Sequence, residues 1–137
     1  MRFLVDTNIC SAHLKNMRSV NSRFIQHAGA LAMSVITLGE LSSWVLRRNA
    51  SPKHLKGLTS LISDVETLDV DYDVAWKYGE LNSELLDRGL PPPGMDLLIA
   101  ATALVHNLIL VTHLEGIVQE WIDLWQKVGG LEKVFEE

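Results

Sequence analysis

The sequence has one cysteine, Cys10, among its 137 residues. A single thiol excludes an internal disulfide framework and a zinc site built from several cysteines, and it suits the reducing cytoplasm. Long apolar runs are also missing. The longest, Leu97 to Val111, is interrupted by His106 and Asn107 and falls short of the ~20 residues that a membrane-spanning helix needs. Asp6 comes too early for the apolar core of a signal peptide. We therefore expect a cytoplasmic protein without a membrane segment.

Acidic residues are scarce in the first half of the chain. Residues 1–63 contain eight Lys and Arg but only Asp6 and Glu40 as acids, whereas residues 64–137 contain four basic and fifteen acidic residues. The net charge of −5 therefore divides into +6 and −11. A basic half can bind a polyanion even when the whole protein is acidic, and two isolated acids within it call for a specific explanation.

Hydrophobic residues make up 47% of the chain, which is typical of a globular domain and excludes a disordered or fibrous class. Short apolar runs alternate with helical patterns. The expected strands are residues 2–5, 30–36, 65–70 and 108–112, and the main helices are expected to begin near 6, 37, 52, 74 and 95. This alternation predicts an α/β fold with a mainly parallel sheet of four to five strands covered on both faces, in one domain spanning 1–137.

Apolar residues at helical spacing mark two of these helices. One face of the helix expected near 37 has Leu38, Leu41, Trp44 and Val45, and the helix expected from 52 carries Leu55, Leu58 and Ile62. The tryptophans are predicted to lie in the core or at an interface rather than to stack on bases: Trp44, Trp76, Trp121 and Trp125. One further helix is expected around 117–125, and 131–135 is either an edge strand or without regular structure.

Three acids occupy equivalent positions relative to the expected strands. Asp6 ends the first strand, Glu40 lies in the first turn of the helix after the second strand, and Asp96 begins the helix after the Pro-rich loop 89–94. Functional groups of open α/β sheets gather beyond the carboxyl ends of the strands. If these carboxylates converge, a divalent cation keeps them ionised, and oxygen ligands favour Mg²⁺ or Mn²⁺ over zinc. Such an ion can activate water for attack on phosphorus.

Each acid also has a purely structural interpretation. Asp6-Thr7-Asn8 are typical helix-start residues, and Thr37-Leu38-Gly39-Glu40 matches a capping box in which Glu40 bonds back to the N-cap amide. Asp96 is a favourable charge at a helix N-terminus. The two interpretations are compatible, because a first-turn acid can both cap a helix and bind a ligand. The occurrence of all three at equivalent positions favours a site.

Three motifs carry a resemblance to a known family: VDTN at 5–8, SVITLGEL at 34–41, and GMDLLIAA at 94–101, the last followed by LVT at 110–112. In order and spacing they resemble PIN-domain ribonucleases, above all the VapC-type toxins of prokaryotic toxin-antitoxin pairs. The resemblance covers residues 1–113 and leaves 114–137 as an atypical tail. It implies a three-layer α/β/α fold, cleavage of RNA that depends on Mg²⁺ or Mn²⁺, a homodimer, and a cognate antitoxin that blocks the site.

Taken residue by residue, the resemblance assigns Asp6, Glu40 and Asp96 to the catalytic, metal-binding site, supported by Thr7, Asn8 and Thr112. Family members usually have Asn or Asp two residues after the threonine, where this chain has Leu114, which cannot bind metal. Glu115 is the nearest substitute as a further catalytic acid, and Asp123 is a more distant one. The departure leaves an alternative function open, a catalytically weakened module that binds antitoxin or RNA without efficient turnover.

Basic residues cluster around the turn between two expected helices: Arg47, Arg48, Lys53 and Lys56. They are predicted to bind RNA phosphates, with an ordinary solvated surface as the alternative. His113 either reaches the substrate or is structural. A phosphatase or receiver relative is a third functional alternative, but Asn8 stands where such proteins usually have a second Asp, and no Lys occurs between 78 and 126.

Overall fold

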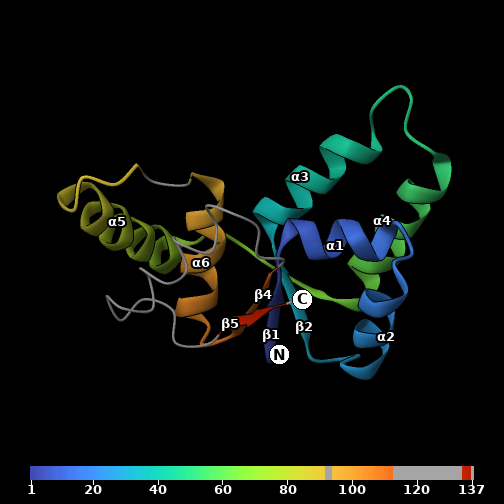
Figure 1. The fold of residues 1–137 in the computed structure, drawn as a ribbon, viewed down its shortest axis with the longest axis horizontal. Coiled ribbons are helices and arrows are strands. Elements are labelled where there is room, and N and C mark those ends of the chain that lie inside the picture. The colour runs from blue at the N-terminus through green and yellow to red at the C-terminus, as the bar shows by residue number, and fades with distance from the viewer. Residues whose placement is uncertain (92–93, 113–133, 137) are drawn as a thin grey trace.

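The computed structural model describes residues 1–91, 94–112 and 134–136. Within this part, five parallel strands form one sheet in the order β3-β2-β1-β4-β5, with helices on both faces (Figure 1). The elements are β1 (Phe3–Val5), α1 (Thr7–Leu14), α2 (Arg18–Gln26), β2 (Leu31–Ser34), α3 (Val35–Val45), α4 (Pro52–Asp64), β3 (Glu66–Leu68), α5 (Tyr72–Asp87), α6 (Met95–Val105), β4 (Ile109–Thr112) and β5 (Val134–Glu136). The predicted α/β/α fold is confirmed.

The two faces of the sheet bury two separate hydrophobic cores. Successive side chains of a strand point to opposite faces. In β1, Phe3 and Val5 pack with α1–α4, whereas Leu4 packs with α5 and α6. The same division is visible in Figure 1, where α5 and α6 lie on one side of the strands and α1–α4 on the other. All three residues of β1 are buried, as expected for a strand covered on both sides.

Helix α3 begins two residues earlier than its sequence predicts. Ser34 is both the last residue of β2 and the N-cap of α3, and its hydroxyl oxygen accepts a hydrogen bond from Ile36 N at 3.1 Å. The expected start near Thr37 is therefore wrong, and so is the capping box. Glu40 lies in the second turn of α3 rather than in its first. Because Glu40 does not bond back to an N-cap amide, its side chain can contact another helix.

The apolar residues expected on α4 differ in burial. Leu58 is buried, whereas Leu55 and Ile62 are 43% and 44% exposed. The helix lies close to α1 at Gly57, where a Cβ atom would be 3.1 Å from Leu14 Cδ2. A Cβ atom at this position would require the end of the Leu14 side chain to shift by a few tenths of an ångström.

The two tryptophans within the described residues differ in their surroundings. Trp44 is partly buried against the core on the α1–α4 side. Trp76 on α5 is 64% exposed and stacks on the exposed ring of Tyr72. The prediction of a core position is therefore wrong for Trp76, and the alternative prediction of an interface position stays untested. Trp121 and Trp125 lie outside the described residues.

The edge strand expected near 131–135 is present as β5, which pairs in parallel with β4. The tail helix expected around 117–125 lies outside the described residues. Across the described part of the chain, no helix is both long enough and apolar enough to cross a bilayer.

Candidate active site

The strand register brings residues distant in sequence to one edge of the sheet. In the parallel ladder, Val5 of β1 is paired with Val111 of β4, and Leu4 is paired with Ala32 of β2. The residue that follows β1, Asp6, therefore lies next to Thr112, the last residue of β4. Its backbone amide donates to Val111 O at 3.1 Å. This carboxyl edge, where α1 and α3 also begin, is the position predicted for a site.

Asp6 combines helix capping with a half-buried carboxylate. As the N-cap of α1, it accepts a hydrogen bond at Oδ1 from Ile9 N at 2.9 Å. Its other oxygen, Oδ2, accepts a hydrogen bond from Thr112 Oγ1. Burial raises the pKa of Asp6 to about 6, with a further contribution from the charge of Asp96, although the Thr112 and Ile9 hydrogen bonds oppose the rise.

Glu40 is bound to α1 through Thr7. The Thr7 hydroxyl, at the first residue of α1, donates to Glu40 Oε1 at 2.6 Å. The hydroxyl oxygen of Thr37, which is completely buried, lies 3.2 Å from that of Thr7. The Glu40 carboxylate is thus held between α3 and α1 by a hydroxyl next to Asp6 in sequence.

Asp96 completes the acidic group. It lies in the first turn of α6, where the helix dipole favours a negative charge. Its pKa is raised above the usual value, first by burial and then by the charge of Glu40. The charge of Asp96 raises the pKa of Asp6, and the charge of Glu40 raises the pKa of Asp96. The three predicted acids therefore lie near one another at the carboxyl edge.

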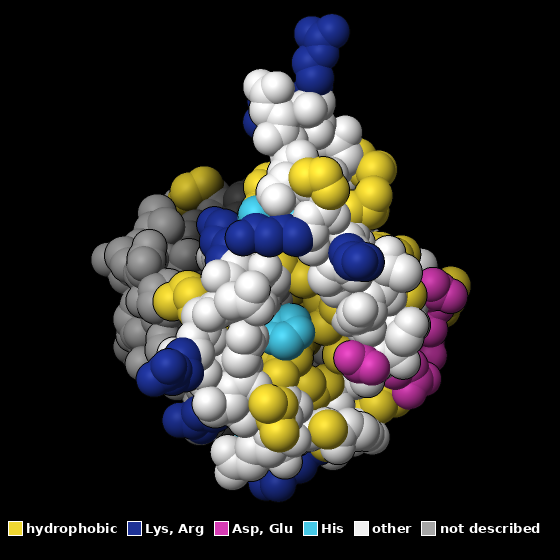
Figure 2. Space-filling model, turned by 90° about the vertical axis from the view of Figure 1, so that its right-hand side faces the viewer, with side chains coloured by type: hydrophobic (Ala, Val, Ile, Leu, Met, Phe, Trp, Pro, Cys, Tyr) yellow, Lys and Arg dark blue, Asp and Glu magenta, His cyan; other side chains and the backbone are white. Residues whose placement is uncertain are grey.

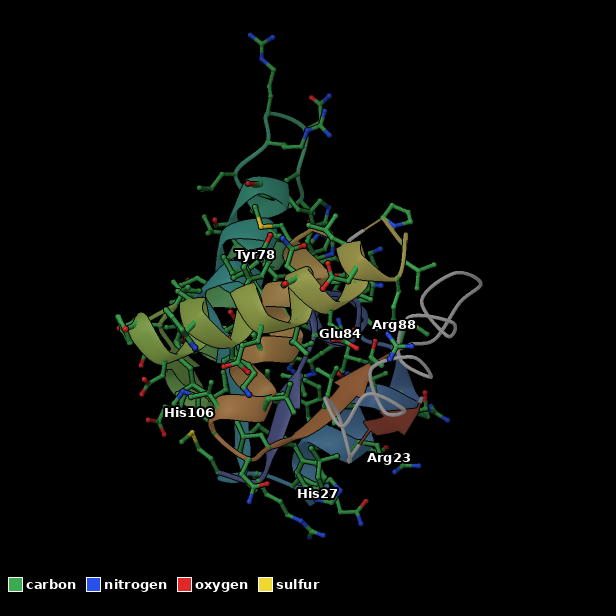
Figure 3. The ribbon with its side chains drawn as sticks, turned by 90° about the vertical axis from the view of Figure 1, so that its left-hand side faces the viewer. Arg23, His27, Tyr78, Glu84, Arg88 and His106 are labelled. Carbon is green, nitrogen blue, oxygen red and sulfur yellow. The ribbon has the colours of Figure 1, made fainter. Side chains whose placement is uncertain are left out.

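No positive side chain compensates these carboxylates within the described residues. The salt bridges found there join Lys77 to Glu80 and Arg88 to Glu84, and both lie along α5. Figure 3 shows Glu84 and Arg88 side by side on that helix. Asp6, Glu40 and Asp96 form no such pair within this part of the chain.

The donor set fits a hard divalent cation. Burial and a neighbouring carboxylate raise the pKa values of both Asp6 and Asp96, and a cation that neutralises the group would relieve this repulsion. The described residues contain no group of three His, Cys, Asp or Glu side chains already close enough to hold a metal ion. Mg²⁺ does not need one, since it usually binds through one or two carboxylates and keeps several of its waters. Asp6 and Asp96, with Glu40 beside Asp96, could hold such an ion.

The remaining predicted site residues divide into two groups. Asn8 is exposed in the first turn of α1 next to Thr7. His113, Leu114, Glu115 and Asp123 lie outside the described residues, so a further acid at Glu115 stays a prediction. Thr37 is the site residue whose position the sequence did not reveal. Its place one turn before Glu40 was visible, but its contact with Thr7 depends on how α1 packs against α3.

The predicted basic cluster lies on the α1–α4 side of the molecule. Arg47 and Arg48 are in the loop 46–51 between α3 and α4, Lys53 and Lys56 are in the first half of α4, and all four are exposed. The α3–α4 connection projects from the body in Figure 1. In Figure 2, Lys and Arg are spread over this face up to its projecting tip, whereas Asp and Glu gather along one margin.

Comparisons with known proteins agree with this architecture. The PIN domain model matches residues 3–115. The chain is 32% identical over 114 residues to the tRNA(fMet)-specific endonuclease VapC of Shigella flexneri, covering 82% of this chain and 86% of that protein. It is 32% identical over 117 residues to ribonuclease VapC2 of Rickettsia felis, with coverages of 82% and 87%.

Solved structures show the same similarity. VapBC2 from Rickettsia felis, bound to a DNA fragment from its promoter, has a TM-score of 0.83 at 28% identity and covers 100% of this chain and 99% of its own. DNA-bound VapBC from Salmonella typhimurium has a TM-score of 0.84 at 28% identity, with coverages of 99% and 98%. Together with the acidic edge, these matches show that the chain belongs to the PIN-domain family and, within it, to the VapC ribonucleases.

Proposed function

We propose that this chain is a metal-dependent endoribonuclease that acts as the toxin of a toxin-antitoxin pair. The observation that carries the proposal is the convergence of Asp6, Glu40 and Asp96, without a basic partner among the described residues, at the edge where α1 and α3 begin. The relatives named ribonuclease and endonuclease support the reaction class. The family match leaves the phosphatase or receiver alternative without support.

The chemistry divides between a bound ion and the protein. Mg²⁺ or Mn²⁺, held by Asp6, Glu40 and Asp96, would supply a Lewis acid for the phosphoryl oxygen and a water of lowered pKa. The chain contributes the placement of the ligands. Thr112 and Ile9 N each hold one oxygen of Asp6, and Thr7 holds Glu40. The N-terminus of α6, next to Asp96, is an electrostatically favourable place for a phosphate.

RNA is the substrate class that the charge distribution favours. Among residues 7–63 the only acid is Glu40, which belongs to the site, so a polyanion meets little repulsion on the α1–α4 side. The loop with Arg47 and Arg48 begins six residues after Glu40, roughly 9 Å along the helix axis. A strand cleaved at the acids can therefore place neighbouring phosphates near these side chains. Transfer RNA is the first candidate, because the Shigella relative is named as specific for it.

A protein antitoxin is the partner that the structural neighbours support. Several of them are VapBC structures, and another is a toxin-antitoxin complex from Klebsiella pneumoniae. Large apolar side chains are exposed on α2, the α3–α4 loop and α4, which suits a protein contact: Ile25 at 78%, Leu46 at 69%, Leu55 at 43% and Ile62 at 44%. We also expect a homodimer that acts in the cytoplasm, where its RNA is. Co-purification with the product of the adjacent gene, followed by native mass spectrometry, tests both the partner and the dimer.

The activity is tested with purified protein and end-labelled transfer RNA, in Mg²⁺, in Mn²⁺ and in EDTA. Cleavage should require the metal, and Asp96→Asn should abolish it while circular dichroism remains unchanged. Asp64→Asn is the matched control, since Asp64 is an exposed acid at the end of α4 and should keep full activity. Full metal-dependent cleavage by Asp96→Asn would refute the assignment. A folded wild type that binds RNA or antitoxin but does not cleave would instead favour the weakened binding module.

A further inference from the structure

The hydroxyl of Thr37 is directed differently from those of Thr59 and Thr102, which bond to carbonyls of their own helices. Its side chain is completely buried in the first turn of α3, one turn before Glu40. Buried Thr102 of α6, by contrast, donates to Leu98 O in its own helix at 2.8 Å, the usual local bond of a helical threonine. The hydrogen bond of Thr37 leads to another helix, because its Oγ1 lies 3.2 Å from Oγ1 of Thr7 in α1.

In the hydrogen bond between the two threonine hydroxyls, Thr37 is the donor and Thr7 is the acceptor. A threonine hydroxyl has one proton, and Thr7 gives its proton to Glu40 Oε1 at the shorter distance of 2.6 Å. An ionised Glu40 has no proton to return. The proton between the two threonines must therefore come from Thr37, which yields a chain of donors from Thr37 through Thr7 to Glu40.

We propose that Thr37 is a positioning residue of the nuclease site, which acts through Thr7 to hold the Glu40 carboxylate beside Asp96. Glu40 is exposed on a long side chain, so without a fixed partner it would exchange among several rotamers. The donated proton of Thr37 fixes the Thr7 hydroxyl rotor with its own proton toward Glu40. This inference rests on the proposed function, because positioning matters only if Glu40 is a ligand.

The test replaces the hydroxyl of Thr37 without changing its volume. Thr37→Val removes the donor, Thr37→Ser keeps it, and Thr102→Val is the matched control, a buried helical threonine whose bond is local. The readouts are the Mn²⁺ dissociation constant, measured by electron paramagnetic resonance without RNA, and kcat and KM for labelled RNA. Thr37→Val should weaken Mn²⁺ binding and lower kcat by about tenfold, as expected for a residue that orients a ligand. KM should stay constant, and Thr37→Ser and Thr102→Val should match the wild type.

A double-mutant cycle tests whether Thr37 acts through Thr7. In a single chain of donors, Thr7→Val already releases Glu40, so the variant with both substitutions should be no worse than Thr7→Val alone. Additive losses would show that Thr37 acts by another route and would overturn the proposal. If Thr37→Val does not fold, the Thr7→Val variant tests the proposal alone. A wild-type Mn²⁺ affinity of Thr7→Val would show that the Thr7 hydroxyl does not position Glu40, and the proposal would be overturned.

The outcomes separate this inference from the proposed function. If the wild type binds Mn²⁺ but cleaves no RNA, the proposed function fails, and the Mn²⁺ affinities still test the role of Thr37. If the wild type cleaves RNA and Thr37→Val equals Thr102→Val in both Mn²⁺ affinity and kcat, the proposed function stands and the positioning role is refuted.

Discussion

Thr112 donates a hydrogen bond to the carboxylate of Asp6, a residue 106 positions earlier in the chain. The contact joins the last residue of β4 to the residue after β1, and the parallel register places them side by side. The bond lowers the pKa of Asp6 against the larger effect of burial. Thr112 therefore helps to decide the pH range in which Asp6 carries a charge.

Replacing Thr112 by valine should raise the pKa of Asp6 further above 6, because the carboxylate loses a donor and stays buried. A carbon-13 NMR titration of the Asp6 carboxyl measures this shift. The pH above which cleavage is half-maximal should rise in parallel. Thr112→Ser, which keeps the hydroxyl, should titrate like the wild type, and an unchanged pKa in Thr112→Val would contradict the role assigned to the bond.

Asp6 should make folding stability depend on pH. With a pKa of about 6, against 3.8 for a free aspartate, the folded state binds more protons than the unfolded state between about pH 4 and pH 6. The free energy of unfolding should therefore fall as the pH rises through this window and level off above it. Asp6→Asn should be more stable than the wild type at pH 7.5 in metal-free buffer, since asparagine also caps helices well.

Urea midpoints at pH 5 and pH 7.5, for the wild type and for Asp6→Asn, measure this dependence. The two proteins should differ at pH 7.5 and converge toward pH 5 as Asp6 takes up its proton. An Asp6→Asn variant that is less stable at pH 7.5 would show that the ionised carboxylate contributes more as a cap than it costs by burial.

Gly94→Ala should destabilise the protein and misplace Asp96. Gly94 is the N-cap of α6, with φ +64° and ψ −119°, a conformation accessible to glycine but not to alanine. The expected cost is about 1–3 kcal/mol, measured by urea denaturation, and metal-dependent cleavage should fall. Gly79→Ala is the control, since Gly79 lies exposed within α5 with open space around it, and it should stabilise by about 0.5–1 kcal/mol.

Removing both arginines of the α3–α4 loop should weaken RNA binding and its dependence on salt. If Arg47 and Arg48 each neutralise one phosphate, the slope of log affinity against log salt should flatten by about 0.7 per residue on single-stranded RNA. Fluorescence anisotropy at several salt concentrations measures the slope. Lys77→Ala, on the opposite side of the sheet, should leave it unchanged. Equal slopes in the wild type and the double variant would assign these arginines to an ordinary solvated surface.

The acids were predictable because their positions follow from topology. Asp6 directly follows a short buried strand, and Asp96 lies in the first turn of a nearly all-apolar helix. Both patterns are unambiguous in the sequence. The parallel sheet places the residue after β1 at its carboxyl edge, and the start of α6, the helix that leads back into β4, lies at the same edge. The difference in net charge between the two halves of the chain can likewise be read directly from the sequence.

The start of α3 could not be predicted in the same way. Val35 and Ile36 are β-branched and continue the apolar run of β2, so they look like strand residues, yet they form the first turn of the helix. The capping box at Thr37 was a coincidental match that this misplaced boundary made plausible. The contact of Thr37 with Thr7 and the exposure of Trp76 depend on helix packing, which periodicity does not encode.

The strand order has a consequence for synthesis of the chain on the ribosome. β1 is made first, but it lies at the centre of the sheet and acquires its neighbour β4 only after residues 109–112 have emerged. Until then, β1 can pair with β2 but not with β4, and Asp6 lacks its donor from Thr112. A nascent chain that still lacks residues 109–112 therefore has an incomplete carboxyl edge, although Asp6, Glu40 and Asp96 have all been synthesised.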